Sequence, residues 1–301
     1  MRILLTGACN FTKEQVREIE GLGFEIDFLK NEKDELDFSV YDGVICNGLF
    51  LYHSIENFIN LKFVQLTSAG YDRVPMDYIK EHGITIYNAR GVYSIPMAEY
   101  ALAGVLNLYK QTRFFRENQK RKRWKKHRGL FELSGRNVCI VGCGSVGSEC
   151  AKRFKAFGCT VTGVDIINDD RTYFDKIYGL PDIATALGIA DVVVITLPLT
   201  EHTHHLFNGS MFDYIKKDAV FVNISRGAVV DTSALIEALK CERLSGAVLD
   251  VFENEPLDGS SELWSLENVF ISPHNSFVGD GNQNRLFELI KKNLRGGEIC
   301  E

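Results

Sequence analysis

The sequence predicts an α/β protein with two doubly wound parallel sheets, and three observations lead to this prediction. Short apolar runs alternate with helical patterns through the first hundred residues, as they do where helices connect parallel strands. The same alternation starts again near Leu133 and continues to residue 272. A chain of 301 residues, 45% hydrophobic and 25% charged, has the length and composition for two such globular domains.

Five strands and two helices are expected in the first domain. Its first helix should start after Thr12, a favourable N-cap, and stop at Gly23, and the second helix opens at Pro75. A longer helix starts at Ser94-Ile95-Pro96 and should lead into the second domain. The expected strands are residues 2–6, 24–29, 43–46, 63–67 and 84–87.

The second domain is expected to continue the alternation with six strands. One helix is predicted over residues 232–239, and the last helix, residues 283–294, ends at Gly296 and could return to pack on the first domain. The expected strands are residues 138–141, 161–165, 191–197, 219–224, 246–250 and 269–272.

A glycine-rich turn follows the first of these strands. Gly142, Gly144 and Gly147 have the spacing G-x-G-x-x-G, a helical pattern follows, and a second apolar run ends at Asp165, 18 residues after Gly147. The glycines permit a tight turn, close approach of a pyrophosphate, and close packing of helix on strand. An ordinary glycine-rich βαβ turn is the alternative, but the order of all parts is that of a dinucleotide site. The Asp165 carboxylate can accept hydrogen bonds from both hydroxyls of an adenosine ribose. It would repel a 2′-phosphate, so NAD is favoured over NADP.

Three later segments each follow a strand and should meet at the carboxyl edge of the second sheet. They are residues 223–227, 250–256 and 272–275. They bring one guanidinium, Arg226, one imidazole, His274, and several carboxylates to the place where a nicotinamide would lie. Reducing a carbonyl by hydride transfer needs an acid, for which histidine is suited near neutral pH, and a cation that holds an anionic substrate. Each residue alone could be an ordinary surface or turn residue, but their joint occurrence at three strand ends favours an active site.

The overall charge argues against nucleic acid as the main partner. The net charge is −6, although residues 110–128 contain ten Lys or Arg against one acid, Glu117. A nucleic-acid patch is one interpretation of this stretch. A solvated helix and linker, anchored by Trp124, is the interpretation favoured by the acidic chain and by the scarcity of aromatic residues.

Neither a membrane nor an oxidising compartment is indicated. No apolar run is long enough to span a bilayer, and the N-terminal run is too short for a signal peptide. The eight cysteines include no C-x-x-C pair and mostly lie in apolar runs, so free thiols and a cytoplasmic location are expected. His202, His204 and His205 are clustered, but a metal site would also need converging partners, usually a carboxylate or thiolate, so no metal is expected.

Taken together, these motifs resemble those of the D-isomer-specific 2-hydroxyacid dehydrogenase family over nearly the whole chain. The long, ordered motifs are the most specific: the G-x-G-x-x-G unit, Asp-Val-Phe-Glu-Asn-Glu-Pro at 250–256, and Ser-Pro-His at 272–274. Asn275-Ser276-Phe277 departs from the small residues that the family usually has after this histidine, which leaves the substrate open. Further matching segments are residues 68–72, 91–94, 98–99, 197–200 with Thr203, and 223–227.

The resemblance implies a role for each matching residue. Arg226 would bind the substrate carboxylate and keto oxygen, and His274, paired with Glu255, would be the general acid–base. Asp250 would contact the nicotinamide amide. The implied substrate-binding residues are Ser68, Ala69 and Gly70, through backbone N–H groups, with Arg226 and His274. The implied cofactor-binding residues are Gly142, Gly144, Ser145, Val146, Gly147, Asp165, Leu197, Pro198, Thr203, Ile224, Ser225 and Asp250.

The resemblance also implies the domain organisation and the reaction. A Rossmann cofactor domain, residues 96–275, would be inserted in a flavodoxin-like substrate domain, residues 1–95 and 276–301, and two chains would form a homodimer. The reaction would interconvert a small 2-keto acid (glyoxylate, hydroxypyruvate, pyruvate or a phosphoglycerate-like acid) and its D-2-hydroxy acid with NAD. An NAD(H)-sensing binding protein of the corepressor type and a dehydrogenase of formate or phosphite are the alternatives.

Overall fold

The computed structural model describes residues 1–167 and 171–296. The chain forms two compact units: unit 1 contains Met1–Tyr93 and the described residues from Gly279 onward, and unit 2 contains Ser94–Val278. These divisions lie two and three residues from the predicted boundaries at 95/96 and 275/276. Unit 1 is therefore built from both ends of the chain.

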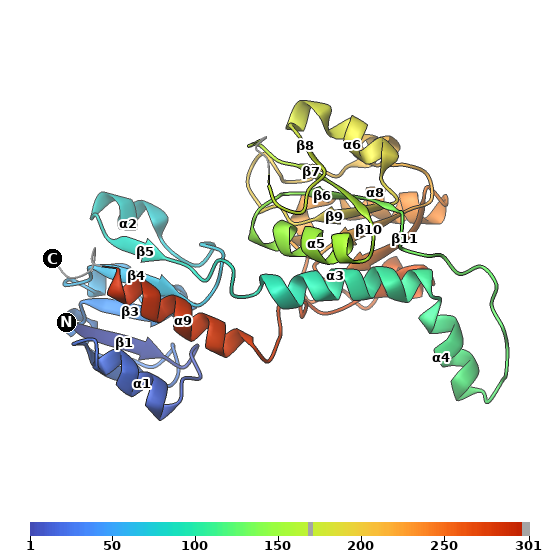
Figure 1. Cartoon of the computed structure of the whole chain (residues 1–301). Helices are drawn as coiled ribbons and strands as arrows, with labels where there is room; N and C mark the ends of the chain where they lie inside the picture. The colour runs from blue at the N-terminus through green and yellow to red at the C-terminus, as the bar shows by residue number, and fades with distance from the viewer. Residues whose placement is uncertain (168–170, 297–301) are drawn as a thin grey trace. The chain divides into compact units, whose positions relative to one another are not determined.

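Unit 1 is a five-stranded parallel sheet with helices on both faces (Figure 1). Its elements are β1 (Arg2–Thr6), α1 (Lys13–Glu20), β2 (Glu25–Leu29), β3 (Gly43–Cys46), β4 (Phe63–Leu66), α2 (Met76–Glu81), β5 (Thr85–Tyr87) and α9 (Asn282–Arg295). The strand order is β2-β1-β3-β4-β5. Because strand residues alternate between faces, Ile3 and Leu5 pack with α1 and α9, whereas Leu4 packs with α2. Phe11 meets Phe287 of α9 edge-on, with the ring centroids 5.5 Å apart.

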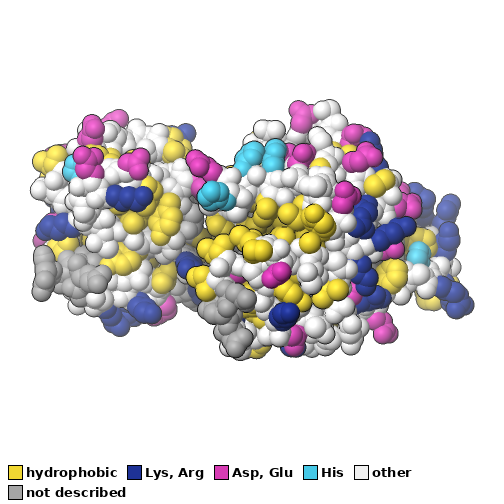
Figure 2. Space-filling model, turned by 90° about the horizontal axis from the view of Figure 1, so that it is seen from above, with side chains coloured by type: hydrophobic (Ala, Val, Ile, Leu, Met, Phe, Trp, Pro, Cys, Tyr) yellow, Lys and Arg dark blue, Asp and Glu magenta, His cyan; other side chains and the backbone are white. Residues whose placement is uncertain are grey.

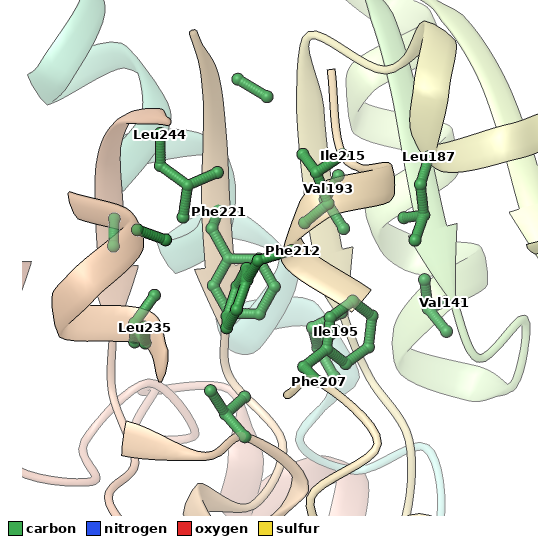
Figure 3. Close-up of a cluster of buried hydrophobic side chains, with 14 of the residues drawn as sticks. Val141, Leu187, Val193, Ile195, Phe207, Phe212, Ile215, Phe221, Leu235 and Leu244 are labelled. Carbon is green, nitrogen blue, oxygen red and sulfur yellow. The ribbon is translucent and has the colours of Figure 1, made fainter. Parts of the chain in front are cut away.

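Unit 2 is a seven-stranded parallel sheet in the order β12-β11-β10-β9-β6-β7-β8. Its elements are α3 (Ser94–Tyr109), α4 (Thr112–Lys120), β6 (Asn137–Val141), α5 (Ser145–Ala156), β7 (Thr160–Val164), β8 (Lys176–Tyr178), α6 (Ile183–Ile189), β9 (Val192–Ile195), α7 (Gly209–Tyr214), β10 (Ala219–Asn223), α8 (Thr232–Lys240), β11 (Leu244–Leu249) and β12 (Val269–Ile271). One face of the sheet packs on α3 and α5, and the other on α6, α7 and α8. The rings of Phe207, Phe212 and Phe221 meet in the second of these cores (Figure 3).

The strand order of unit 2 reverses between β6 and β9, which are neighbours in the sheet. Ligands of doubly wound sheets bind outside the carboxyl ends of the strands at such a point. The predicted class, α/β with two doubly wound parallel sheets, is confirmed, and all eleven predicted strands are present with ends shifted by at most two residues. The sequence did not predict β8, α6 or α7, which are short.

Seven of the eight cysteines lie in the described part of the chain, where all are free thiols; six are buried and Cys241 is exposed. Burial raises the pKa of Cys9, Cys139 and Cys150 to about 12, so these thiols stay protonated. Cys300 lies outside the described residues. Within those residues, no helix combines the length and the apolar character needed to cross a membrane.

Candidate active site

The glycine turn between β6 and α5 has the geometry of an anion-binding cradle. Gly142 has φ of +98°, which glycine adopts easily, and a Cβ on Gly147 would lie 2.1 Å from the Gly142 oxygen. The first N–H groups of α5 are not capped by a side chain and can bind phosphate. The Ser145 Oγ lies 2.8 Å from the Ser94 Oγ, which ties the start of α5 to the start of α3. These residues, with Gly144 and Val146 in the same turn, fit a dinucleotide pyrophosphate.

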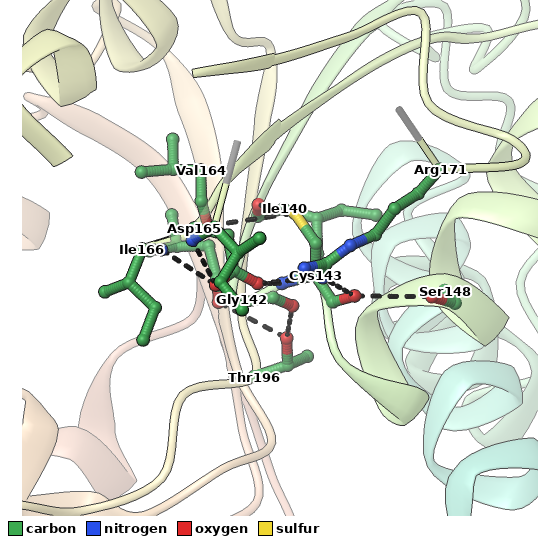
Figure 4. Close-up of polar contacts among 11 residues, drawn as sticks. Ile140, Gly142, Cys143, Ser148, Val164, Asp165, Ile166, Arg171 and Thr196 are labelled. Carbon is green, nitrogen blue, oxygen red and sulfur yellow. Dashed lines mark hydrogen bonds and ion pairs between the residues drawn. The ribbon is translucent and has the colours of Figure 1, made fainter. Parts of the chain in front are cut away.

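Asp165, which follows β7, belongs to a hydrogen-bond network with the glycine turn (Figure 4). Its Oδ2 accepts from the Cys143 N–H at 2.8 Å and from the Arg171 Nη1 at 3.0 Å. Its Oδ1 accepts from the Ile166 N–H at 2.7 Å, and Arg171 also donates to the Cys143 carbonyl. The carboxylate therefore braces the glycine turn, and Arg171 partly neutralises its charge. Selection of NAD by Asp165 stays a prediction.

The segment after β9 lies beside the glycine turn. The Thr196 Oγ1 donates to the Gly142 oxygen at 2.5 Å (Figure 4). The Thr203 Oγ1 donates to the Pro198 oxygen and accepts from the Thr200 N–H, both at 2.7 Å, so this loop is closed on itself. Leu197, Pro198 and Thr203 thus share one ordered loop, and their contact with an adenosine stays a prediction.

Arg226 is held by the turn that follows β10. The Asn223 Oδ1 accepts from the Ser225 N–H at 3.1 Å and from its hydroxyl at 2.9 Å, and the Asn223 Nδ2 donates to the Arg226 oxygen at 3.1 Å. The Arg226 Nη1 donates to the Ser225 oxygen at 2.9 Å. A Cβ on Gly227 would lie 1.8 Å from the Phe252 carbonyl carbon, so only glycine lets this turn press against the segment after β11.

Glu255 and His274 form a hydrogen-bonded pair across neighbouring strand ends. The Glu255 Oε2 lies 2.8 Å from the His274 Nδ1, and the Glu255 Oε1 accepts from the Phe252 N–H at 3.0 Å. Because a carboxylate only accepts, Nδ1 carries the hydrogen, and Nε2 is the nitrogen left for proton transfer. The two side chains are 41% and 36% exposed, so a substrate can reach the imidazole. The Phe277 ring stands edge-on to it, with the centroids 6.0 Å apart.

The backbone of His274 has a left-handed conformation, with φ of +51°, which is unusual for a residue with a Cβ. Asp250 accepts from three successive N–H groups of this turn: its main-chain oxygen from His274 at 2.7 Å, Oδ1 from Asn275 at 2.8 Å, and Oδ2 from Ser276 at 2.9 Å. Successive N–H groups around such a residue form an anion-binding hollow, which the fully buried Asp250 carboxylate fills. Asp250 therefore supports the His274 turn, and its contact with the nicotinamide amide stays a prediction.

The other acids and histidines of this region have different partners. Glu253 pairs with His205; burial acts to raise the Glu253 pKa, but hydrogen bonds from Thr232 and His205 lower it overall. The rings of His204 and His205 stack with centroids 4.1 Å apart. Among the residues with described coordinates, no group of three or more His, Cys, Asp and Glu is arranged to hold a metal ion. Glu255 is thus the carboxylate that pairs with the His274 imidazole.

The predicted substrate loop follows β4 in unit 1. The Ser68 oxygen accepts from the Ala89 N–H and the Ala69 oxygen from the Asn88 Nδ2, both at 2.8 Å. The Ser68 Oγ donates to the Gly70 oxygen at 3.0 Å. All three carbonyl groups are therefore bonded within unit 1, and substrate binding by the N–H groups of this loop stays a prediction.

Two contributors to the site were not predicted. Tyr100 of α3 donates to the Ser272 hydroxyl, which in turn donates to the Asp250 Oδ1. Tyr100 and Ser272 are 172 residues apart, so no local pattern links them. Arg171, by contrast, follows Asp165 by six residues, and a basic residue so close to the acid was a signal that could have been used.

Dinucleotide-dependent oxidoreductases combine a cradle of this kind with a proton donor at a neighbouring strand end, and this is the class to which the fold and the site point. The chain belongs to the D-isomer specific 2-hydroxyacid dehydrogenase family, since the family model of the NAD binding domain matches residues 102–276. The predicted family and enzyme class are thereby confirmed.

Relatives support this membership over most of the chain. The chain is 35% identical to a glyoxylate/hydroxypyruvate reductase A of Arabidopsis thaliana over 252 residues, which are 80% of this chain and 76% of that protein. It is 33% identical to a glyoxylate reductase of Pyrococcus horikoshii over 260 residues, which are 81% of this chain and 76% of that protein. A solved D-isomer specific 2-hydroxyacid dehydrogenase family protein from Aeromonas salmonicida superposes with a TM-score of 0.82 at 30% identity, covering 98% of this chain and 94% of that one.

Proposed function

We propose that the protein reduces glyoxylate and hydroxypyruvate, small 2-keto acids, to their 2-hydroxy acids with a nicotinamide dinucleotide. The family gives the reaction class, and two relatives at 33% and 35% identity, a glyoxylate reductase and a glyoxylate/hydroxypyruvate reductase, support these substrates. The observation that carries the proposal is the 2.8 Å pair of Glu255 and His274, which leaves the imidazole Nε2 as a proton donor.

Arg226, His274 and Glu255 would each have a defined part in the reduction. When bound, the nicotinamide supplies the hydride that C2 of the keto acid receives. Arg226 binds the substrate carboxylate in a fork and stabilises the negative charge that develops on the carbonyl oxygen. His274 donates its Nε2 proton to that oxygen, and Glu255 orients the ring and stabilises its imidazolium form before the transfer.

Oxidation of NADH, followed by fluorescence with a panel of acids, tests the proposal. We expect turnover of glyoxylate and hydroxypyruvate to exceed that of pyruvate. Turnover of formate or phosphite alone, measured with NAD⁺, would instead indicate a dehydrogenase of another small anion. Tight NADH binding without turnover of any acid would indicate a dinucleotide sensor, and either of these results would overturn the proposal.

We also propose that NADH is preferred to NADPH, because the Asp165 carboxylate repels a 2′-phosphate. Replacing Asp165 with asparagine, which keeps an acceptor for the Cys143 N–H, should reduce the NADH/NADPH ratio of kcat/KM about tenfold. Replacing Arg171 with glutamine should raise that ratio, since Asp165 then loses a cation 3.0 Å away. Steady-state kinetics with both cofactors measure the two ratios. A shift in the same direction for both variants would mean that the charge of Asp165 does not select the cofactor.

We propose that two copies of the chain associate through the basic arm, residues 110–128, which projects from unit 2 with α4 (Figure 1). Lys and Arg side chains gather there (Figure 2). The arm holds ten of the 34 Lys and Arg and one of the 40 acids, so the rest of the chain, with 24 and 39, has a net charge of −15. A second copy therefore offers complementary charge. Trp124, 97% exposed, lines a pocket of about 710 Å³ with Phe115 and His127.

Light scattering after size exclusion should therefore give about twice the chain mass of 33.9 kDa. Trp124→Ser should shift the protein toward the monomer, because a desolvated aromatic anchor is lost. Trp264→Ser is the control, since Trp264 is also exposed but lies outside the basic arm. A wild-type chain that stays monomeric at low salt would contradict this proposal.

A cytoplasmic location is proposed as well. Its support is that the seven described cysteines are free, six of them buried, as in a reducing compartment.

A further inference from the structure

Helix α3 is linked to the turn that carries His274 by a hydrogen bond from one hydroxyl group, that of Tyr100. The Tyr100 hydroxyl donates to the Ser272 Oγ, and the Ser272 hydroxyl donates to the Asp250 Oδ1. The Asp250 carboxylate in turn binds the N–H groups of Asn275 and Ser276, the two residues after His274, at 2.8 and 2.9 Å. Tyr100, Ser272 and Asp250 thus form one hydrogen-bond chain that ends at the turn carrying the imidazole.

We propose that Tyr100 is a positioning residue for His274 and acts through Ser272 and Asp250. This inference rests on the proposed function, in which His274 is the proton donor. The His274 backbone needs support, since few residues with a Cβ adopt φ of +51°. Because the N–H groups of Asn275 and Ser276, the two residues after His274, bind the Asp250 carboxylate, a rotation of that carboxylate would move the turn and with it the imidazole.

The hydrogen-bond chain has one direction of donation. Burial raises the pKa of Tyr100 to about 12, so the phenol keeps its proton. The hydrogen bond to Ser272 lowers this pKa, and the nearby Asp250 charge raises it. Because Tyr100 donates to the Ser272 Oγ, the Ser272 hydrogen is left to point at Asp250. The Tyr100 ring also packs on Phe270 of β12, with the centroids 5.9 Å apart, so packing and hydrogen bonds join α3 to the same strand end.

Tyr100→Phe removes the hydroxyl and keeps the ring, and Tyr109→Phe is its matched control. Tyr109 lies on the same helix and is buried, and burial likewise raises its pKa to about 12. Tyr100→Phe should lower kcat for keto acid reduction about 3- to 10-fold, the worth of one hydrogen bond, with NADH affinity kept. Tyr109→Phe should leave kcat unchanged, and the Tm of the two variants should be alike.

A double variant tests whether Tyr100 acts through Ser272. Tyr100→Phe combined with Ser272→Ala should be no slower than Ser272→Ala alone, because both substitutions break the same hydrogen-bond chain. Ser272→Thr, which keeps the hydroxyl, should retain most of the turnover. If the effects of the two single substitutions add up, Tyr100 acts by another route and the inference is overturned.

The imidazole resonances of His274 in NMR give a readout that does not depend on turnover. Identified by their absence in His274→Asn, they should shift in Tyr100→Phe and stay in place in Tyr109→Phe. Resonances and kcat that are both unchanged in Tyr100→Phe would overturn the positioning role. If the wild type reduces no keto acid, the proposed function fails, whereas the resonances still decide whether Tyr100 positions His274.

Discussion

Replacing His274 with asparagine is expected to lower kcat for keto acid reduction about 10²- to 10⁴-fold, the usual contribution of a positioned general acid. Asparagine is the informative substitute because it tolerates the left-handed backbone of residue 274, where φ is +51°. The loss then reflects the missing proton donor and not a displaced turn. The affinity for NADH, measured by fluorescence titration, should be kept because the glycine turn between β6 and α5 is unchanged.

His202→Asn is the control for this substitution, since His202 is an exposed histidine of the same unit. Its kcat and KM should equal those of the wild type. A His274→Asn enzyme that retains more than about a tenth of wild-type turnover would exclude His274 as the general acid, because positioned acids contribute more than that. The proton would then have to come from another group or from water.

The glycine turn and the strands could be predicted because the information for them is local. The positive φ of Gly142 and the close approach at Gly147 are requirements on single positions, so the spacing of glycines reveals them. Parallel strands buried on both faces form continuous apolar runs, such as the fully buried β9 and β10. The glycine spacing and the apolar runs can both be recognised in the sequence without knowledge of the tertiary structure.

Edge elements and distant partners could not be predicted in this way. β8 has three residues and lies at the edge of its sheet, with Lys176 exposed, so it has no apolar run to detect. The bond between Tyr100 and Ser272 depends on where α3 packs against β12, which no spacing in the sequence gives. The candidate catalytic residues were therefore predicted from motifs, whereas the residues that support them became visible only in the fold.

At Asp165 the sequence motif describes only part of the hydrogen bonding that the fold shows. The sequence rule treats this acid as a free acceptor for the ribose hydroxyls. In the fold it also accepts from the Cys143 N–H and from Arg171. A carboxylate has about four lone-pair directions, so a ribose bound at Asp165 would share it with these donors. If Asp165 selects the cofactor, as we propose, the preference depends on the balance between Asp165 and Arg171, and the two substitutions should act in opposite directions.

Replacing Arg226 with lysine is expected to lower kcat/KM for glyoxylate about 10²- to 10³-fold, as loss of a hydrogen-bonded charge partner does. The turn fixes Arg226 before the substrate arrives, because its Nη1 donates to the Ser225 oxygen at 2.9 Å and Gly227 presses on the backbone of Phe252. A planar guanidinium can bind both carboxylate oxygens at once, whereas an ammonium on a flexible stem cannot. We expect kcat to fall and KM to rise, since in the proposed mechanism Arg226 also stabilises the charge that develops on the carbonyl oxygen.

Arg243→Lys is the matched control for this substitution. The Arg243 guanidinium also donates to a main-chain oxygen, that of Asp213 at 2.7 Å, but Arg243 lies just before β11, at the opposite edge of the sheet from the strand carboxyl ends. Its replacement should lower the Tm and leave KM unchanged. Guanidinium added to Arg226→Ala should restore part of the rate, because it supplies the missing fork in the vacated position. If Arg226→Lys keeps kcat/KM within about threefold, less than the loss of a fork requires, the substrate carboxylate is bound elsewhere, and the N–H groups of residues 68–70 become the main candidates.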